Sequence, residues 1–407
     1  MAESLHRRKI LFVAAAWPPY RAPEADHALQ ECVHLAEQGL EVHVLTTRRA
    51  EVARPEGVTV HDVIDDWSMS ELGKVATVIR AVRPDAGFMF FLGHLYYYSK
   101  MATLIPALFR LLRPRAPFVS QFSNLGKGAP KGDDLKTRIK REAFHRAGRW
   151  RYGSMLVLSD RILLMSRPHL KRLARIHPSL LAKAELVPPP SLVGRLDDAV
   201  GARLAGRESL GVSSETFLFT YFSRLYPAKG IETLLRAFRQ VVDELPQARL
   251  AMVGGYHSAD AWWQDDDYPT QLARLVDELD LREQVIWTGE YDWEGGAASE
   301  YLHASDVAIL PFDRGVYLHN SSFAAVAAHG LPAIVTAPRG GFEPEIVPGD
   351  NVYGIEPRDQ DALRDGMLEL RGDAELRARL GKGAADLAYR WFSWDGCTTA
   401  IRSALRV

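Results

Sequence analysis

Two cationic side chains follow a predicted strand in the second half of the chain. The apolar run 217–222 has the composition of a strand, and Arg224 comes directly after it. Lys229 and Gly230 then precede a predicted amphipathic helix. This order brings two positive charges and the free N–H groups of a helix start to one place, where an anion would bind well. An ordinary surface loop would contain the same residues, so neighbouring segments have to decide between the two interpretations.

A second set of groups suited to an anion follows the predicted strand 307–310. Asn320, Ser321 and Ser322 are residue types that favour a helix start, where their N–H groups can hold a phosphate. Gly255, just after another predicted strand, could let the backbone approach the same anion. Ordinary helix capping and a tight turn are the alternatives for these residues taken alone. Together with the two cations, they predict a two-sided anion site.

Composition and charge are those of a soluble globular protein. The 407 residues are 47% hydrophobic and 25% charged with a net charge of −1, which suits two domains and does not suggest a nucleic-acid partner. Cys32 and Cys397 lie far apart without the spacing of metal ligands, which indicates a reducing compartment. No leader peptide or membrane-spanning stretch is recognisable. We therefore expect a cytoplasmic protein.

Both halves alternate apolar runs with helical patterns. A strand at 9–17, a helix at 24–38 and a strand at 41–47 form a predicted βαβ unit. The prolines at 188–190 indicate a hinge between the halves. Further strands are expected at 58–62, 86–91, 118–122, 155–158, 184–187, near 217, and at 249–253, 285–288, 307–310 and 333–336.

This alternation predicts an α/β protein with two Rossmann-like domains that face one another across a cleft. Ligands in such sheets lie beyond the carboxyl ends of the strands, so the cleft is the expected site. We place the N-terminal domain at 1–187 and the C-terminal domain at 188–385. Two independently functioning α/β domains are the alternative.

The block from Arg224 to Gly230, and the Gly-Leu-Pro sequence at 330–332 before a strand, resemble the second domain of the GT-B glycosyltransferases. The resemblance is to the retaining family 4 type, which includes glycogen and sucrose synthases. It implies that the C-terminal domain binds a nucleotide-diphosphate sugar, that the N-terminal domain binds the acceptor, and that a helix at 386–407 crosses back to the N-terminal domain. It further implies transfer with retention by front-face attack, with no cofactor and no required metal. The donor phosphates would then contact Arg224, Lys229, Ser321, Ser322 and Gly255.

The chain departs from this family at two glutamates that most members carry eight residues apart. Tyr317 and Ala325 occupy those positions, where the family usually contacts the donor sugar and the ribose. Asp313, Tyr317 and Glu343 are therefore the candidates for the sugar or ribose contacts. The loss of both glutamates leaves open a protein that binds nucleotide sugars without catalysis, and a nucleotide-sugar 2-epimerase is the other alternative to a transferase.

In the N-terminal domain, His94 follows the predicted strand 86–91. The resemblance implies an active-site histidine there that faces the donor sugar, whereas packing among the neighbouring tyrosines is the alternative. Aromatic side chains around it, with Trp17 and Phe91, could form a stacking wall for a small acceptor such as a sugar or cyclitol ring. The candidates for acceptor contact are Tyr20, His27, Tyr96 and Tyr97.

Two charged segments have simpler explanations. The acidic run 265–267 is expected to be a solvated turn rather than a metal site. The basic stretch 127–175 could give weak membrane association or hold an anionic acceptor, although solvated helix faces explain it as well. The partners we expect are a nucleotide sugar and a small-molecule acceptor, without nucleic acid, and the oligomeric state stays open.

Overall fold

The computed structural model describes residues 7–125, 134–140, 143, 152, 154–256, 267–291 and 295–407. Asp265 and Asp266 of the acidic run lie outside these ranges. The same holds for part of the basic stretch, including Lys127, Arg141 and Arg149. The chain folds into two compact units, one made of Met1–Pro188 with Trp394–Val407 and the other of Pro189–Ser393.

The first unit is a seven-stranded parallel sheet in the order β3-β2-β1-β4-β5-β6-β7. Its central strands are buried on both faces, which is why they appear in the sequence as continuous apolar runs. The strands are β1 (Lys9–Ala14), β2 (Glu41–Thr47), β3 (Val58–Ile64), β4 (Ala86–Phe91), β5 (Phe118–Phe122), β6 (Arg161–Leu164) and β7 (Ala184–Leu186).

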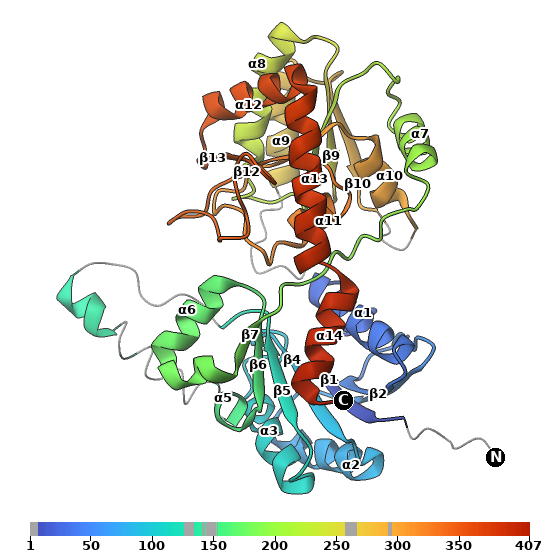
Figure 1. Cartoon of the computed structure of the whole chain (residues 1–407), viewed down its shortest axis with the longest axis vertical. Helices are drawn as coiled ribbons and strands as arrows, with labels where there is room; N and C mark the ends of the chain where they lie inside the picture. The colour runs from blue at the N-terminus through green and yellow to red at the C-terminus, as the bar shows by residue number, and fades with distance from the viewer. Residues whose placement is uncertain are drawn as a thin grey trace. The chain divides into compact units, whose positions relative to one another are not determined.

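Helices cover both faces of this sheet and enclose two hydrophobic cores, one on each face. One core contains side chains of α2, α3, α5 and α6, and the other contains side chains of α1 and α14 (Figure 1). The helices are α1 (Pro23–Glu37), α2 (Leu72–Val82), α3 (Lys100–Leu112), α5 (Ser154–Leu158), α6 (Arg167–Ile176) and α14 (Trp394–Leu405), with 3-10 turns η1 (Met69–Glu71) and η2 (Pro178–Lys183).

The expected strand at 155–158 is wrong, because these residues form the helix α5 and the strand follows at β6. A run of four apolar residues has no decisive period, so neighbouring packing determines its structure. Here Met155 and Leu156 are buried, whereas Val157 is exposed, in a short helix that packs on α3.

The last helix of the chain, α14, completes the first unit by packing on α1 and on the sheet (Figure 1). A buried histidine and a buried carboxylate lie in contact beside it on α1, where the His27 Nε2 is 2.9 Å from the Glu31 Oε1. The Cys397 thiol of α14 lies 3.9 Å from the same carboxylate, and the Trp394 ring packs on the His27 ring. Charged and apolar contacts therefore join residues that are far apart in the sequence.

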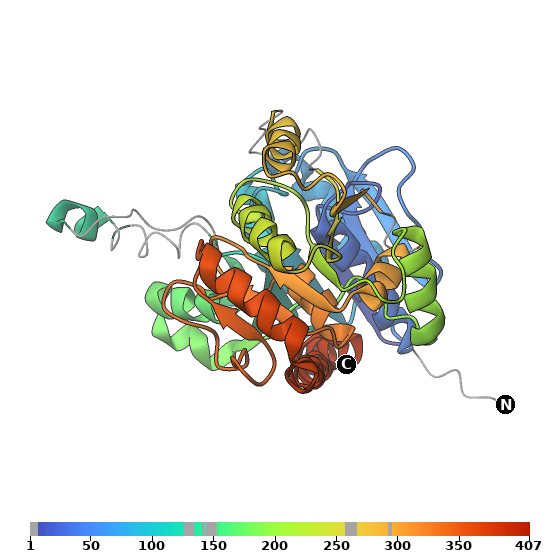
Figure 2. The same cartoon turned by 90° about the horizontal axis from the view of Figure 1, so that it is seen from above.

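The second unit is a six-stranded parallel sheet in the order β10-β9-β8-β11-β12-β13. Helices α8 and α12 pack side by side, as do α7 and α10 (Figure 1, Figure 2). The strands are β8 (Leu218–Phe222), β9 (Arg249–Val253), β10 (Val285–Gly289), β11 (Val307–Leu310), β12 (Ala333–Thr336) and β13 (Tyr353–Ile355). The helices are α7 (Ala199–Ser209), α8 (Ile231–Glu244), α9 (Tyr268–Glu278), α10 (Ala297–Ala304), α11 (Ser321–Ala328), α12 (Gln360–Gly372) and α13 (Ala374–Trp391).

The predicted α/β class with two Rossmann-like sheets is confirmed. Helix α13 runs through residue 386, where the sequence analysis placed a boundary. None of the helices in the described ranges is both long and apolar enough to cross a membrane.

Replacing Glu31 by Ala should destabilise the first unit by about 3 kcal/mol, because it leaves the buried His27 without its partner. Calorimetry should then record a fall in melting temperature of about 6 to 12 °C for a unit of this size. Glu37→Ala on the same helix is the matched control, since it removes an exposed partner from His34 and should cost under about 1 kcal/mol. Equal melting temperatures for the two variants would contradict a stabilising role for the buried pair.

Candidate active site

The two sheets share a topological feature that locates a site in each of them. In the second unit the strand order reverses at β8 and β11, which are neighbours although β9 and β10 lie between them in the sequence. The first unit has the same reversal at β1 and β4. The loops that leave two strands at such a reversal run to opposite faces of the sheet. Ligands of parallel α/β sheets bind between these loops, beyond the carboxyl ends of the two strands. The predicted phosphate-binding residues of the second unit follow β8 and β11.

The segment after β8 is held by main-chain hydrogen bonds that place Arg224. The Leu225 N–H donates to the Gly255 carbonyl at 3.0 Å, so this segment continues alongside the one that follows β9. The Tyr221 hydroxyl, buried in β8, donates to the Arg224 carbonyl at 2.9 Å. A Cβ on Gly255 would lie 2.0 Å from the Glu290 Cγ, so only glycine fits here without a shift. The structure thus places the predicted Gly255 next to the backbone of Arg224.

Lys229 lies among aromatic rings rather than carboxylates. Its Nζ is 3.7 Å from the centre of the Phe312 ring and 5.0 Å from that of Tyr226, distances at which a cation is attracted to the ring face. Burial, followed by the charge of Arg224, lowers the pKa of Lys229 to about 7. Within the described ranges, no carboxylate forms a salt bridge with either cation.

Gly230 joins the loop after β8 to the loop after β11. It begins α8 in the left-handed region with φ 69°, and a Cβ there would lie 1.9 Å from the Pro311 carbonyl oxygen. The Asp313 N–H also donates to the Ala228 carbonyl at 3.2 Å. Close backbone approach is therefore what brings Lys229 beside the β11 loop.

The start of α11 is open toward a ligand. Its N-cap residue, Asn320, makes no side-chain capping bond to the helix, because its Oδ1 accepts from the Tyr317 N–H at 2.6 Å. Ser321 and Ser322 form the first turn and are partly exposed. Their hydroxyl and N–H groups can therefore serve an anion, assisted by the positive end of the helix dipole.

The loop before α11 is held by a buried carboxylate. Glu343 is 6% exposed, and its Oε2 accepts from the Leu318 N–H at 2.7 Å. The Tyr317 ring stacks on the His319 ring with centres 5.3 Å apart. Burial, then the charge of Glu343, raises the pKa of Tyr317. Burial, then the charge of Lys229, lowers the pKa of His319 to about 4, so this imidazole is neutral.

Asp313, the other carboxylate candidate for a sugar contact, pairs with an arginine. Its Oδ2 lies 2.6 Å from the Arg358 Nη2. The Asp313 side chain is 15% exposed and that of Arg358 is 72% exposed, so solvent screens the pair on one side. Both predicted carboxylates are therefore engaged with protein groups at the edge of the site.

His94 lies at the corresponding edge of the first unit, in the turn directly after β4. Its side chain is exposed, and its carbonyl accepts from the Tyr97 N–H at 2.9 Å. The Tyr97 and Tyr98 side chains are 63% and 59% exposed. This turn presents one imidazole and two aromatic rings to solvent. Tyr20, after β1, is partly exposed and lies under the Arg49 guanidinium at 4.7 Å.

Tyr96 corrects the predicted aromatic wall, because it belongs to the core. It is 1% exposed, and its hydroxyl lies within hydrogen-bonding distance of the main-chain carbonyls of Val13, at 3.1 Å, and Phe90, at 2.8 Å. Trp17 and Phe91, which the sequence analysis placed in the same wall, are buried as well. Their rings stabilise the fold and present no surface to an acceptor.

The prediction that His27 contacts the acceptor is also corrected. This side chain is 4% exposed, and its ring packs against those of Phe90 and Trp394 beside the Glu31 carboxylate. Contact with an acceptor would require its surroundings to open. The periodicity of α1 predicts that this position faces inward, but the partner on α14 is too distant in sequence to be recognised.

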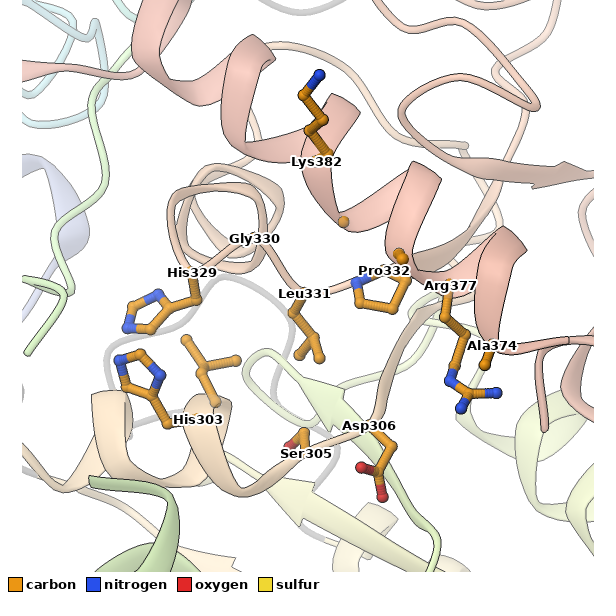
Figure 3. A pocket seen from close by; sticks show the side chains of 13 residues that line it. His303, Ser305, Asp306, His329, Gly330, Leu331, Pro332, Ala374, Arg377 and Lys382 are labelled. Atoms are coloured by element: carbon orange, nitrogen blue, oxygen red, sulfur yellow. The ribbon is translucent and has the colours of Figure 1, made fainter. Parts of the chain in front are cut away.

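A pocket of about 390 Å³ lies elsewhere in the second unit (Figure 3). Ser305 and Pro332 line it just before β11 and β12, so it lies at the amino ends of the strands, opposite the cation site. His329 in its wall contacts the Ala325 carbonyl through Nδ1 at 2.8 Å and the Ser299 hydroxyl through Nε2 at 2.7 Å. Burial lowers the pKa of His329 to about 4, and these contacts are structural.

Sequence analysis missed two residues of the cation site, Phe312 and His319. Neither has a type or spacing that distinguishes it from an ordinary loop residue. The only available signal was their position after a buried strand, where loops of parallel sheets carry functional groups.

Parts of the sequence are similar to known proteins. Residues 203–387 match the family described as "Glycosyl transferases group 1". The chain is 26% identical to a D-inositol 3-phosphate glycosyltransferase of Stackebrandtia nassauensis over 95% of this chain and 89% of that protein. It is 30% identical, over 47% of each chain, to a GDP-mannose-dependent monoacylated alpha-(1-6)-phosphatidylinositol monomannoside mannosyltransferase of Corynebacterium glutamicum.

Solved structures show the same fold. Sucrose-phosphate synthase from Thermosynechococcus elongatus is 18% identical with a TM-score of 0.67, covering 98% of each chain. Anabaena HepE, solved in complex with UDP-glucose, is 16% identical with a TM-score of 0.67 over 98% of this chain and 99% of its own. The likeness in sequence and structure shows the GT-B arrangement of two Rossmann-like domains.

Gly230→Ala should disrupt the cation site, because the added Cβ meets the Pro311 carbonyl and the backbone has a positive φ. We expect the affinity of the site for inorganic diphosphate, measured by calorimetry, to fall by about tenfold or more. Gly211→Ala is the matched control, since Gly211 has φ 65° but open space around its Cβ position. A variant at residue 230 that binds inorganic diphosphate as well as the control would show that the close approach does not position Lys229.

Proposed function

We propose that the chain transfers a sugar from a nucleotide-diphosphate sugar to a small-molecule acceptor, a proposal supported by the match of residues 203–387 to the group 1 glycosyl transferases. The transfer retains the configuration of the sugar and requires no metal ion. The observation that carries the proposal is the pair of cations, Arg224 and Lys229, next to an open helix start and without a carboxylate partner in the described part of the chain.

The role of Arg224 and Lys229 in this proposal follows from the negative charge that develops on the leaving group. As the bond between sugar and diphosphate breaks, negative charge grows on the β-phosphate. Arg224, Lys229 and the N–H groups at Ser321 and Ser322 are fixed in advance to stabilise that charge, which is where such a site gains most of its rate. The acceptor hydroxyl attacks from the same face and gives its proton to the departing phosphate oxygen, so no protein base is needed.

The donor proposal has support from relatives. HepE has been solved with UDP-glucose, and the Corynebacterium relative is named as GDP-mannose-dependent. Asp313, Tyr317 and Glu343 lie at the edge of the site where sugar and ribose would extend from the phosphates. Because Glu343 and Asp313 already bind protein groups, Tyr317 is the one of the three whose side chain is best placed to contact the donor.

The acceptor belongs to the first unit in this proposal. His94 and the exposed Tyr97 follow β4, where the imidazole can hydrogen-bond an acceptor and the Tyr97 ring can stack on a sugar or cyclitol. The Stackebrandtia relative, similar over nearly the whole chain, is named for a phosphorylated inositol acceptor. A soluble acceptor of this size, used in the cytoplasm, fits the net charge of −1 and needs no nucleic-acid or stable membrane partner.

Replacing Arg224 or Lys229 by Ala should lower the transfer rate by about a hundredfold or more, because each removes charge stabilisation that grows in the transition state. The assay is release of nucleoside diphosphate from UDP-glucose or GDP-mannose with inositol phosphates as acceptors. Arg236→Ala is the matched control, since this exposed arginine lies on α8 away from its first turn. Unchanged melting temperatures would show that the folds are intact.

Additional measurements in the same assay distinguish a transferase from an epimerase and from a binding protein. Turnover of the donor without any acceptor would indicate an epimerase, and donor binding without turnover would indicate a binding protein. Analysis of the anomeric configuration of the product tests retention, and an unchanged rate in EDTA is expected. Near-normal rates in both the Arg224 and Lys229 variants would refute the proposed mechanism.

A further inference from the structure

Two exposed arginines lie at the carboxyl edge of the second sheet, outside the cation site described above. Arg314 is in the loop after β11, and Arg339 is in the loop after β12. Within the described ranges, neither guanidinium forms a hydrogen bond or an ion pair with another residue. An exposed arginine is ordinary by itself, but these two belong to loops that are fixed to one another beside the predicted phosphate site.

The backbone brings the two arginines close together. A Cβ on Gly315, the residue after Arg314, would lie 2.4 Å from the Cα of Pro338, the residue before Arg339. Because consecutive Cα atoms are about 3.8 Å apart, the Cα atoms of Arg314 and Arg339 are separated by about 12 Å or less. Two arginine side chains can reach one oxyanion across this distance.

Hydrogen bonds hold the same two loops on either side of this contact. The Val316 N–H donates to the Thr336 carbonyl at 2.9 Å, and the Thr336 hydroxyl donates to the Phe312 carbonyl at 2.6 Å. The Phe312 ring in turn lies 3.7 Å from the Lys229 Nζ. The loops of the two arginines are therefore joined to the cation site through protein contacts.

A row of neighbouring side chains leads from the cation site to Arg314. The charge of Lys229 acts on His319, and the His319 ring stacks on the Tyr317 ring with centres 5.3 Å apart. Burial and then Glu343 raise the pKa of Tyr317, and the charge of Arg314 opposes them. A substrate whose diphosphate is bound at Lys229 can therefore present a further group to Arg314 along this row.

The acidic residues near these loops do not neutralise the two arginines. Asp313 pairs with an arginine after β13, and the buried Glu343 accepts a main-chain N–H. Glu290 follows β10, which is three strands away from β11 in the sheet. The remaining acids of the two loops, Glu345 and Asp350, form no ion pair with either guanidinium in the described part of the chain. Positive charge at this edge is therefore available to a ligand.

Resting on the proposed function, we propose that Arg314 and Arg339 bind a second oxyanion carried by a substrate, separate from the diphosphate of the donor. The chemistry is that of a carboxylate or phosphate, which a guanidinium binds through two parallel hydrogen bonds. The oxyanion has two sources, the carboxylate of a uronic acid as the transferred sugar or a phosphate on the acceptor. In either case the site selects an acidic substrate over a neutral one of the same shape.

Calorimetry on the full chain with matched pairs of donors tests the first source. UDP-glucose and UDP-glucuronate differ only in the carboxylate, as do GDP-mannose and GDP-mannuronate. We expect the acidic donor to bind the wild type about tenfold or more tightly, and this ratio of Kd values to approach unity in Arg314→Ala and Arg339→Ala. Because base and diphosphate are the same within a pair, a general change in donor binding cancels from the ratio.

The second source is tested with the donor site filled by UDP. If the oxyanion belongs to the acceptor, inositol 3-phosphate should bind about tenfold or more tightly than inositol, and both alanine variants should remove this preference. Arg274→Ala is the matched control in both experiments, since this exposed arginine of α9 forms no ion pair within the described ranges and should keep the wild-type ratios.

A preference in one experiment that both alanine variants abolish supports the inference and identifies the source. Equal affinities for acidic and neutral ligands in both experiments, or preferences that either variant leaves intact, overturn it. Binding of UDP-glucose or GDP-mannose would then leave the proposed function standing, whereas absence of binding by every donor overturns both. Arg314→Gln and Arg339→Gln, which keep a long polar side chain without the charge, replace an alanine variant that does not fold.

Discussion

Two like charges held close together, with no carboxylate partner in the described part of the chain, are the constraint on which the second unit depends. Arg224 and Lys229 carry like charges, and burial adds to the cost of charging the lysine, which its contact with the Phe312 ring face offsets in part. Electrostatics alone would move these side chains apart. The backbone prevents this, because Gly230 packs against the Pro311 carbonyl and fixes the loop that carries the lysine. The arrangement is unfavourable when empty, so its favourable interaction appears only when an anion is bound.

The carboxylates near this site serve the fold and do not neutralise it. Glu343 is buried and accepts a main-chain N–H from Leu318, which orients the loop that leads to α11. Asp313 is paired with Arg358 at the surface. A carboxylate that contacted Lys229 directly would compete with the diphosphate for the same cation. Using the two acids to hold loops instead keeps the positive charge at the strand ends available to a ligand.

Much of the fold could be predicted because a strand buried in a parallel sheet is a continuous apolar run. The expected strands at 41–47, 86–91 and 118–122 have the observed bounds, as do those at 249–253, 307–310 and 333–336. The run at 155–158 failed because four apolar residues fit a helix turn as well as a strand. The strand at 353–355 was missed because three residues carry too little pattern to be recognised.

The sequence was enough to predict which charged residues lie near the candidate site. It was not enough to predict which of the neighbouring side chains are buried. Arg224 and Lys229 could be proposed because they follow a buried strand, next to a helix start and near a second segment suited to an anion. Tyr96 and His27 were misjudged because their surroundings come from distant segments, in one case the main chain of β1 and in the other Trp394. Aromatic residues next to a strand end can face either the core or solvent, and sequence spacing does not distinguish the two. Tyr97, next to Tyr96 in sequence, is exposed.

Both units have the same reversal of strand order in their sheets. They differ in the residues that follow the two strands at that reversal. In the second unit, Arg224 and Lys229 follow β8 and an open helix start follows β11, which suits a charged group. In the first, Tyr20 follows β1 and His94 with an exposed tyrosine follows β4, which suits a ring with hydroxyl groups. Parallel sheets constrain where a ligand can bind, since all their strand ends meet at one edge. The few residues after those ends differ between the two units, and the proposed function therefore assigns the donor to one sheet and the acceptor to the other.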